Sequence, residues 1–220
     1  MRIVPKVASA VLSLFATPFL FSASLYSFDS ANSTFSDDPL TLGFVFTANS
    51  TFEVTSLGWF DSTGAGFQSE HTVGIFDSTG NLLVSTTLGS GTTDPLSGNF
   101  RYHSISPLTL NSGSEYTLAG TSGGPADSWT INNFVNGFTV NPAFTVGENA
   151  SRFSYSTDLV YPESHFSNYI VYAGPNLDGQ ESNQESNCVT PEPASILLVP
   201  FAGLALLMVR RFRSSGCVLQ

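Results

Sequence analysis

The stretch Phe52-Glu53-Val54-Thr55-Ser56-Leu57-Gly58-Trp59-Phe60 decides the fold. Its side chains alternate with a period of two residues, as they do when successive residues point to opposite faces of a β-sheet. Aromatic and β-branched residues dominate it, and these residues favour strands. It ends at Asp61-Ser62-Thr63-Gly64, a sequence typical of a turn. The sequence therefore predicts a β-strand at 52–60.

Similar short segments surround this strand, separated at short intervals by Gly, Asn, Asp and Ser, and no amphipathic helical stretch of useful length interrupts them. We predict further strands at 42–47, 72–76, 82–87, 100–105, 116–121, 138–140, 144–146 and 168–172. Many short strands with turns between them predict an all-β fold, an antiparallel β-sandwich of the jelly-roll-like kind. We place this domain at residues 25–173.

The pentapeptide Phe60–Gly64 recurs as Phe76–Gly80. In each copy an apolar strand end meets Asp-Ser-Thr-Gly, where Asp caps its own backbone and Gly takes a positive φ. A second hypothesis is a calcium site at Asp61 or Asp77 with loop carbonyls, but a full calcium loop needs more oxygen ligands than either copy supplies. Two turns are the favoured interpretation, and the sequence indicates no cofactor and no established metal site.

The N-terminus has the three parts of a secretory leader. Arg2 and Lys6 are followed by an apolar run at 7–21 and by Ser22-Ala23-Ser24, small residues suited to signal peptidase. We predict a signal peptide at 1–24.

The C-terminus carries an apolar segment and then a basic cluster. Residues 194–209 are uncharged, and as a helix they span roughly 24 Å, against about 30 Å for the hydrocarbon core of a bilayer. We predict a transmembrane helix at 194–209, with Arg210, Arg211, Arg213 and a tail at 214–220 on the cytoplasmic side. The polar residues 174–190 predict a flexible stalk between the domain and this helix.

The order Pro191-Glu192-Pro193, apolar helix, Arg210-Arg211-Phe212-Arg213 resembles the PEP-CTERM sorting signal of exported bacterial proteins, here at 191–213. The resemblance implies recognition by an exosortase, removal of the helix, and a protein that is anchored transiently in the inner membrane before it reaches the cell surface or the extracellular space. A rival interpretation of the last four residues, Cys217-Val218-Leu219-Gln220, is a C-a-a-X prenylation pattern.

A second resemblance lies in the middle of the chain. The segments Leu57–Asp61, His71–Asp77, Gly98–Tyr102 and Leu108–Leu110, with Gly113 and Tyr116, resemble an uncharacterised domain that is frequent in exported proteins with PEP-CTERM ends. It implies a β-sandwich similar to carbohydrate-binding modules, with no established activity.

The net charge of the exported part disfavours some classes of binding partner. The chain has 7 basic and 17 acidic residues, but only Arg101 and Arg152 are basic between the two sorting signals, while all 17 acidic residues lie between Asp29 and Glu192. Two basic against 17 acidic residues give the exported part a net charge of about −15, compared with −10 for the whole chain. A surface of this charge repels nucleic acid and anionic lipid.

These observations lead to one functional hypothesis and one alternative. The hypothesis is a non-enzymatic exported surface protein that binds extracellular polysaccharide, with Trp129 as the expected exposed glycan contact among the candidates Trp59, Trp129, Tyr102, Tyr155 and Tyr161. The alternative is a secreted hydrolase acting on glycans or proteins. Gly120-Thr121-Ser122-Gly123-Gly124 fits G-x-S-x-G but lacks the helical pattern that should follow, and a glycosidase needs two carboxylates across a cleft.

Overall fold

A computed structural model describes residues 22–36, 39–165 and 171–182. These residues form antiparallel β-sheets, and the one helical segment among them is the 3₁₀ turn Asn132–Phe134. The predicted all-β, antiparallel fold is confirmed. The predicted transmembrane helix, the tail and nearly all of the predicted signal peptide lie outside the described residues.

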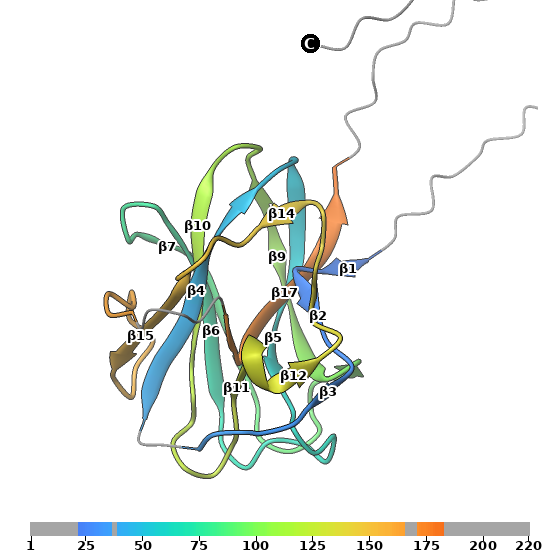
Figure 1. Cartoon of the computed structure of the whole chain (residues 1–220), viewed down its shortest axis with the longest axis vertical. Helices are drawn as coiled ribbons and strands as arrows, with labels where there is room; N and C mark the ends of the chain where they lie inside the picture. Colours follow the sequence, from blue (N-terminus) through green and yellow to red (C-terminus); the bar gives the residue numbers. More distant parts are fainter. Residues whose placement is uncertain (1–21, 37–38, 166–170, 183–220) are drawn as a thin grey trace, which may run out of the picture. The chain divides into compact units, whose positions relative to one another are not determined.

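Two larger sheets make up most of the domain (Figure 1). The first has the order β1-β17-β5-β9-β8: Ala23–Ser24, Pro175–Glu181, Phe52–Phe60, Phe100–Leu110 and Leu96–Ser97. The second has the order β14-β4-β10-β6-β7, and β15 also pairs with β4: Phe144–Thr145, Leu40–Ala48, Glu115–Thr121, His71–Asp77, Leu82–Leu88 and Ser151–Tyr155. The strand predicted at 52–60 has these same bounds.

Three two-stranded ribbons complete the pairing. They are β2 with β13, β3 with β12, and β11 with β16: Tyr26–Ser27 with Thr139–Val140, Ser30–Ala31 with Val135–Asn136, and Thr130–Ile131 with Tyr172–Ala173. Each ribbon ties a segment near one end of the domain to a segment far along the chain, so both ends belong to the folded unit.

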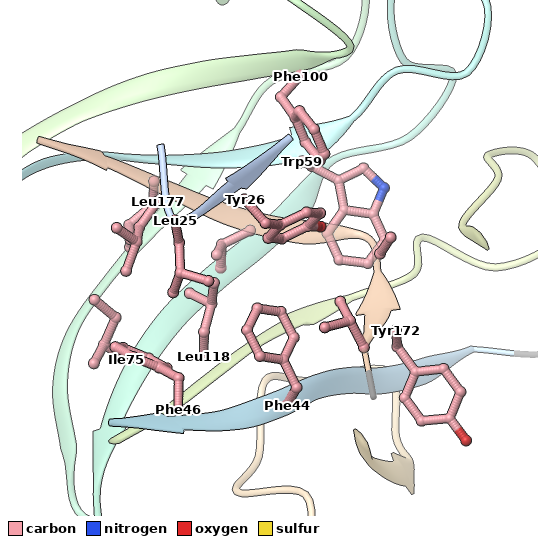
Figure 2. Close-up of a cluster of buried hydrophobic side chains, with 14 of the residues drawn as sticks. Leu25, Tyr26, Phe44, Phe46, Trp59, Ile75, Phe100, Leu118, Tyr172 and Leu177 are labelled. Carbon is pink, nitrogen blue, oxygen red and sulfur yellow. The ribbon is translucent and has the colours of Figure 1, made fainter. Parts of the chain in front are cut away.

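The core lies between the two larger sheets (Figure 2). Trp59 of β5 is fully buried and stacks on His71 of β6, in the other sheet, with ring centroids 4.7 Å apart. Glycines make room for the indole: a Cβ added at Gly120 or at Gly174 would lie 2.8 Å or 2.5 Å from its ring atoms. The sheets therefore face each other as in a β-sandwich, and Trp59 is a core residue rather than a surface contact.

The prediction of a flexible stalk at 174–190 is wrong for its first part. Pro175–Glu181 is β17, which pairs with β5 on one flank and with β1 on the other, and Leu177 is fully buried. The domain also begins earlier than residue 25, because Ala23 and Ser24 pair with Gly179 and Asp178. The domain thus extends to the last described residue, 182, and the predicted leader boundary at residue 24 falls just after β1.

Candidate functional site

Asp61 is a buried carboxylate held by its own turn and by one arginine. Its Oδ1 accepts hydrogen bonds from the amides of Thr63 and Gly64, and its Oδ2 accepts from the Gly66 amide and from Nε of Arg101, both at 2.8 Å. Burial by itself raises the pKa of Asp61, but the hydrogen bonds from Gly66, Arg101 and Thr63 outweigh it, and the pKa lies below its ordinary value. Asp61 is therefore an ion-pair partner.

Arg101 is also buried, and its guanidinium bonds to more than Asp61. Nη1 donates to the backbone oxygen of Asp94 at 2.8 Å, and Nη2 donates to that of Gly64 at 3.0 Å. The side chain of Asp94 in turn accepts from the Gly89 amide and lies 2.7 Å from Nδ1 of His103. The group is a cross-link between the 61–66 turn, the 89–95 loop and β9.

Asp77, in the second copy of the turn, has an exposed setting. Its Oδ1 accepts from the amides of Thr79 and Asn81, and its Oδ2 accepts from the side-chain amide of Asn81 at 2.8 Å. These bonds, led by those from the side chains of Asn81 and Thr79, hold the pKa of Asp77 well below its ordinary value. In both turns the carboxylate oxygens already bond to donors of their own loop, and the described residues contain no group of three or more His, Cys, Asp or Glu side chains that could hold a metal ion.

The prediction that Trp129 is an exposed glycan contact is wrong. Trp129 is 8 % exposed, stacks on Phe35 with ring centroids 4.9 Å apart, and meets Tyr172 edge-on. An isolated pair of bridging hydrogen bonds joins the backbones of residues 35 and 129. Among the predicted aromatic candidates, Tyr155 is the exposed one, at 79 %.

Ser122, His71 and Asp127 lie near one another without forming a relay. The Ser122 hydroxyl accepts a hydrogen bond from the Leu40 amide and is buried. Nδ1 of His71 lies 2.8 Å from the backbone oxygen of Thr121, and Nε2 lies 3.3 Å from the Asp127 carboxylate. Neither ring nitrogen faces the serine, so the G-x-S-x-G match has structural partners in place of a catalytic base.

Asp127 caps the neighbouring loop. Its carboxylate accepts hydrogen bonds from the amides of Gln68 and Ser69, at 2.9 and 2.7 Å, beside His71. Burial by itself raises the pKa of Asp127, but the hydrogen bonds with His71, Gln68 and Ser69 outweigh this effect. The pKa of Asp127 therefore lies below its ordinary value.

A pocket of about 180 Å³ lies where the N-terminal segment meets β9 and β17. We call it the β17 pocket. Four buried aromatic residues line it together with four serines, Asn99 and Asp178; the aromatic residues are Tyr26, Phe28, Phe100 and Tyr102. Drug-sized ligands occupy pockets of about 300–1,000 Å³, so this one is suited to a single small polar unit.

The two tyrosines of the β17 pocket stay protonated. Burial raises the pKa of Tyr102 above its ordinary value, and the nearby Asp178 carboxylate raises it further. Burial likewise raises the pKa of Tyr26, whose hydroxyl donates to the Pro175 carbonyl at 2.9 Å. The Tyr102 ring packs against Gly58, where an added Cβ would lie 2.6 Å from a ring atom. The ring therefore depends on a glycine at position 58.

Sequence reasoning missed Asp178 and Asn99 as site residues. Asp178 lies in the segment predicted as stalk, and Asn99 lies in the turn before β9. The sequence signal that could have found them is Leu177, an isolated apolar residue within the polar 174–190 segment. Leu177 is fully buried in β17. The predicted sorting residues Pro191, Glu192, Pro193, Arg210, Arg211 and Arg213 lie outside the described residues.

The fold and the pocket define an all-β, sandwich-like domain with a small polar-aromatic pocket at one sheet. Residues 29–171, roughly two thirds of the chain, match the family described as a domain of unknown function (DUF4082), and the chain belongs to that family. No curated protein matches the sequence. The described residues include no helix with the length and apolarity of a membrane span. The family match ends before β17, so Asp178 lies outside it.

Proposed function

We propose that this protein is an exported, non-enzymatic surface protein that binds extracellular polysaccharide in the β17 pocket. The observation that carries the proposal is the composition of that pocket: four aromatic side chains line it together with hydroxyl, amide and carboxylate groups. Small-ligand sites typically combine an apolar, aromatic lining with a few convergent polar groups. A sugar unit offers the matching surfaces, hydroxyls at its edge and C–H groups on its faces.

The pocket favours binding over hydrolysis. Asp178 is the one carboxylate among the residues that line it, whereas glycosidases place two carboxyl groups about 5–5.5 Å or about 6.5–9.5 Å apart across the scissile bond. A second pocket, near Ser69 and Thr121, also has a single carboxylate on its wall, that of Glu70. A jelly-roll-like sandwich with one acid in its pocket is suited to holding a glycan.

Export and processing form the second part of the proposal. Signal peptidase would remove the leader; because Ala23 and Ser24 pair with β17, we place the cut before Ser22 and not at the predicted residue 24. The PEP-CTERM signal at 191–213 would be read by an exosortase after transient single-pass anchoring. The mature protein should then lack everything after roughly Thr190. Intact-mass analysis of protein recovered from the surface of the native host checks this, and recovery of chains that still end in Gln220 would contradict it.

Glycan binding is tested by pull-down of the purified mature protein with polysaccharides of the host envelope and with defined glycans. The variant Tyr102→Phe removes one hydrogen-bonding hydroxyl from the pocket and should weaken binding about two- to twelvefold, since a hydrogen bond contributes about 0.5–1.5 kcal/mol. Tyr155→Ala, at an exposed ring on the other large sheet, is the control and should leave binding unchanged. Loss of binding in Tyr155→Ala but not in Tyr102→Phe would move the site to Tyr155.

A further inference from the structure

Asp178 is the one charged side chain that lines the β17 pocket. Its carboxylate is only partly buried, and it accepts hydrogen bonds from the Ser22 hydroxyl at 2.8 Å and from the Gly179 amide at 2.9 Å. A carboxylate has about four lone-pair positions, so two such bonds leave acceptor capacity for a ligand. The site therefore presents negative charge together with free acceptor positions.

The rest of the lining adds no positive charge to balance Asp178. Its other polar groups are the side chains of four serines and Asn99 and the two tyrosine hydroxyls, which remain protonated because their pKa values are raised. The Asp178 carboxylate interacts electrostatically with the Tyr102 hydroxyl, because the charge of Asp178 contributes to the raised pKa of Tyr102. A ligand in the pocket thus meets neutral hydroxyls and one anion.

The two arginines of the domain cannot supply the missing cation. Arg101 is buried in its ion pair with Asp61, and Arg152 donates to the backbone oxygens of Asn149 and Ser151. The exported part as a whole carries a net charge of about −15. This field repels an acidic glycan on approach and attracts a positively charged one.

We propose that the β17 pocket selects glycans that carry a free amine, that is, polysaccharides with unacetylated amino-sugar units, through contact between the sugar ammonium and the Asp178 carboxylate. This inference rests on the proposed function and adds the chemical class of the ligand. A lysine side chain carries the same ammonium, but it has no hydroxyl groups to match the four serines, Asn99 and Tyr102. The residues that carry the argument, Asp178 and Tyr102, lie within the domain whether the leader ends before or after β1.

The test compares four tetrasaccharides of similar size with the purified mature protein by calorimetry at one salt concentration. They are oligomers of glucosamine, N-acetylglucosamine, glucose and galacturonic acid. The glucosamine oligomer should bind about tenfold or more tighter than the glucose oligomer, because hydrogen bonds to charged groups contribute roughly twice as much as neutral ones. The galacturonic acid oligomer should bind weakest.

Two variants separate the pocket carboxylate from the overall charge. Asp178→Asn should reduce the glucosamine affinity to that of glucose while leaving glucose binding in place. Glu115→Gln removes the same charge from an exposed position at the start of β10, in the other sheet, and should leave the preference intact. If Asp178→Asn does not fold, the wild type provides the same test: raising the pH until the sugar amine is neutral should abolish the preference.

The outcomes distinguish this inference from the proposed function. Equal binding of glucosamine and glucose oligomers would overturn amine selection and leave glycan binding standing. Failure of every saccharide to bind would overturn the proposed function, and the inference with it. A preference that survives in Asp178→Asn, or a tetralysine peptide that binds as tightly as the glucosamine oligomer, would show that the pocket does not select amino sugars.

Discussion

The two copies of Phe-Asp-Ser-Thr-Gly have the same sequence and different environments. At Phe60–Gly64 the aspartate is 6 % exposed and its Oδ2 receives Nε of Arg101. At Phe76–Gly80 the aspartate is turned to solvent, and the equivalent oxygen receives the side chain of Asn81. In both copies Oδ1 accepts from the hydroxyl and amide of the threonine two residues on.

The comparison separates what five residues encode from what the fold adds. The Asp–Thr bonds and the positive φ of Gly64 and Gly80, +70° and +84°, are common to both copies, so they belong to the pentapeptide itself. The buried ion pair belongs to one copy, because Arg101 lies opposite Trp59 in the β5–β9 register, two residues before Asp61. An identical turn is therefore a local cap in one place and a tertiary cross-link in the other.

The largest effect should come from breaking the cross-link. Asp61→Ala leaves the buried guanidinium of Arg101 without its anion, which typically costs about 3–5 kcal/mol of unfolding free energy. Asp77→Ala removes an exposed cap and should lower the free energy of unfolding by only a small fraction of that amount. Urea unfolding of both variants measures the difference, and equal destabilisation would show that Asp61 acts only as a cap.

Lowering the pH should produce the next largest loss of stability. The pKa values of Asp61 and Asp127 are lowered in the folded protein, so the unfolded chain binds protons first as the pH falls through the ordinary aspartate value of about 3.9. Their contribution is complete above about pH 5 and is lost progressively below it. Melting temperatures between pH 2 and 7 should show this decline, with a shallower slope in Asp61→Asn. A flat profile down to pH 3 would contradict the assignment.

Replacing the glycine at the end of each turn should destabilise the protein by a similar amount in the two copies. Gly64→Ala and Gly80→Ala each force an L-residue into left-handed backbone, at a cost of roughly 1–2 kcal/mol. At Gly80 an added Cβ would also lie 3.3 Å from the Tyr161 ring, so this variant should be slightly the worse of the two. Calorimetric melts of both variants measure the costs. A much larger cost at Gly64 would place the difference between the copies in the backbone.

Calcium should have the smallest effect. The carboxylate oxygens of both turns already accept hydrogen bonds from their own loops, so millimolar calcium and magnesium should shift the melting temperature alike, by screening the negative charge. Sodium chloride at sufficient concentration should reproduce the shift. A calcium-selective rise that is lost in Asp61→Asn or Asp77→Asn would establish a cation site at that turn.

The sequence predicted strands well where their ends were marked and poorly where they were not. The strand at 52–60 alternates between buried and half-buried side chains over its first four residues and has an Asp-Ser-Thr-Gly turn at its end, and its bounds were predicted correctly. β17 was missed because Pro175, Asn176, Asp178 and Gly179 resemble a loop, and a register shift at Asp178/Gly179 breaks the alternation. Its strand character comes from pairing with β5 and β1, which no local pattern records.

The candidate site was less predictable for the same reason. The walls of the β17 pocket come from residues 22–28, 97–102 and 178, which the β1–β17 and β5–β9 pairings bring together across about 150 residues of chain. Trp129 showed the opposite failure: its Gly- and Pro-rich surroundings resemble an exposed loop, but bridging bonds to residue 35 and stacking on Phe35 bury it. Exposure of an aromatic residue depends on what packs over it.

The position of Asp178 within β17 also has a mechanical consequence. The strand ends at Glu181, and the chain then continues toward Pro191, so a ligand held at Asp178 is three residues, or about 10 Å of extended strand, from the end of the strand. In the proposed anchored state, tension on a bound polysaccharide would run along this short piece of β17. The hydrogen bonds to β5 and β1 would then resist in shear, and most of the sandwich would carry no load.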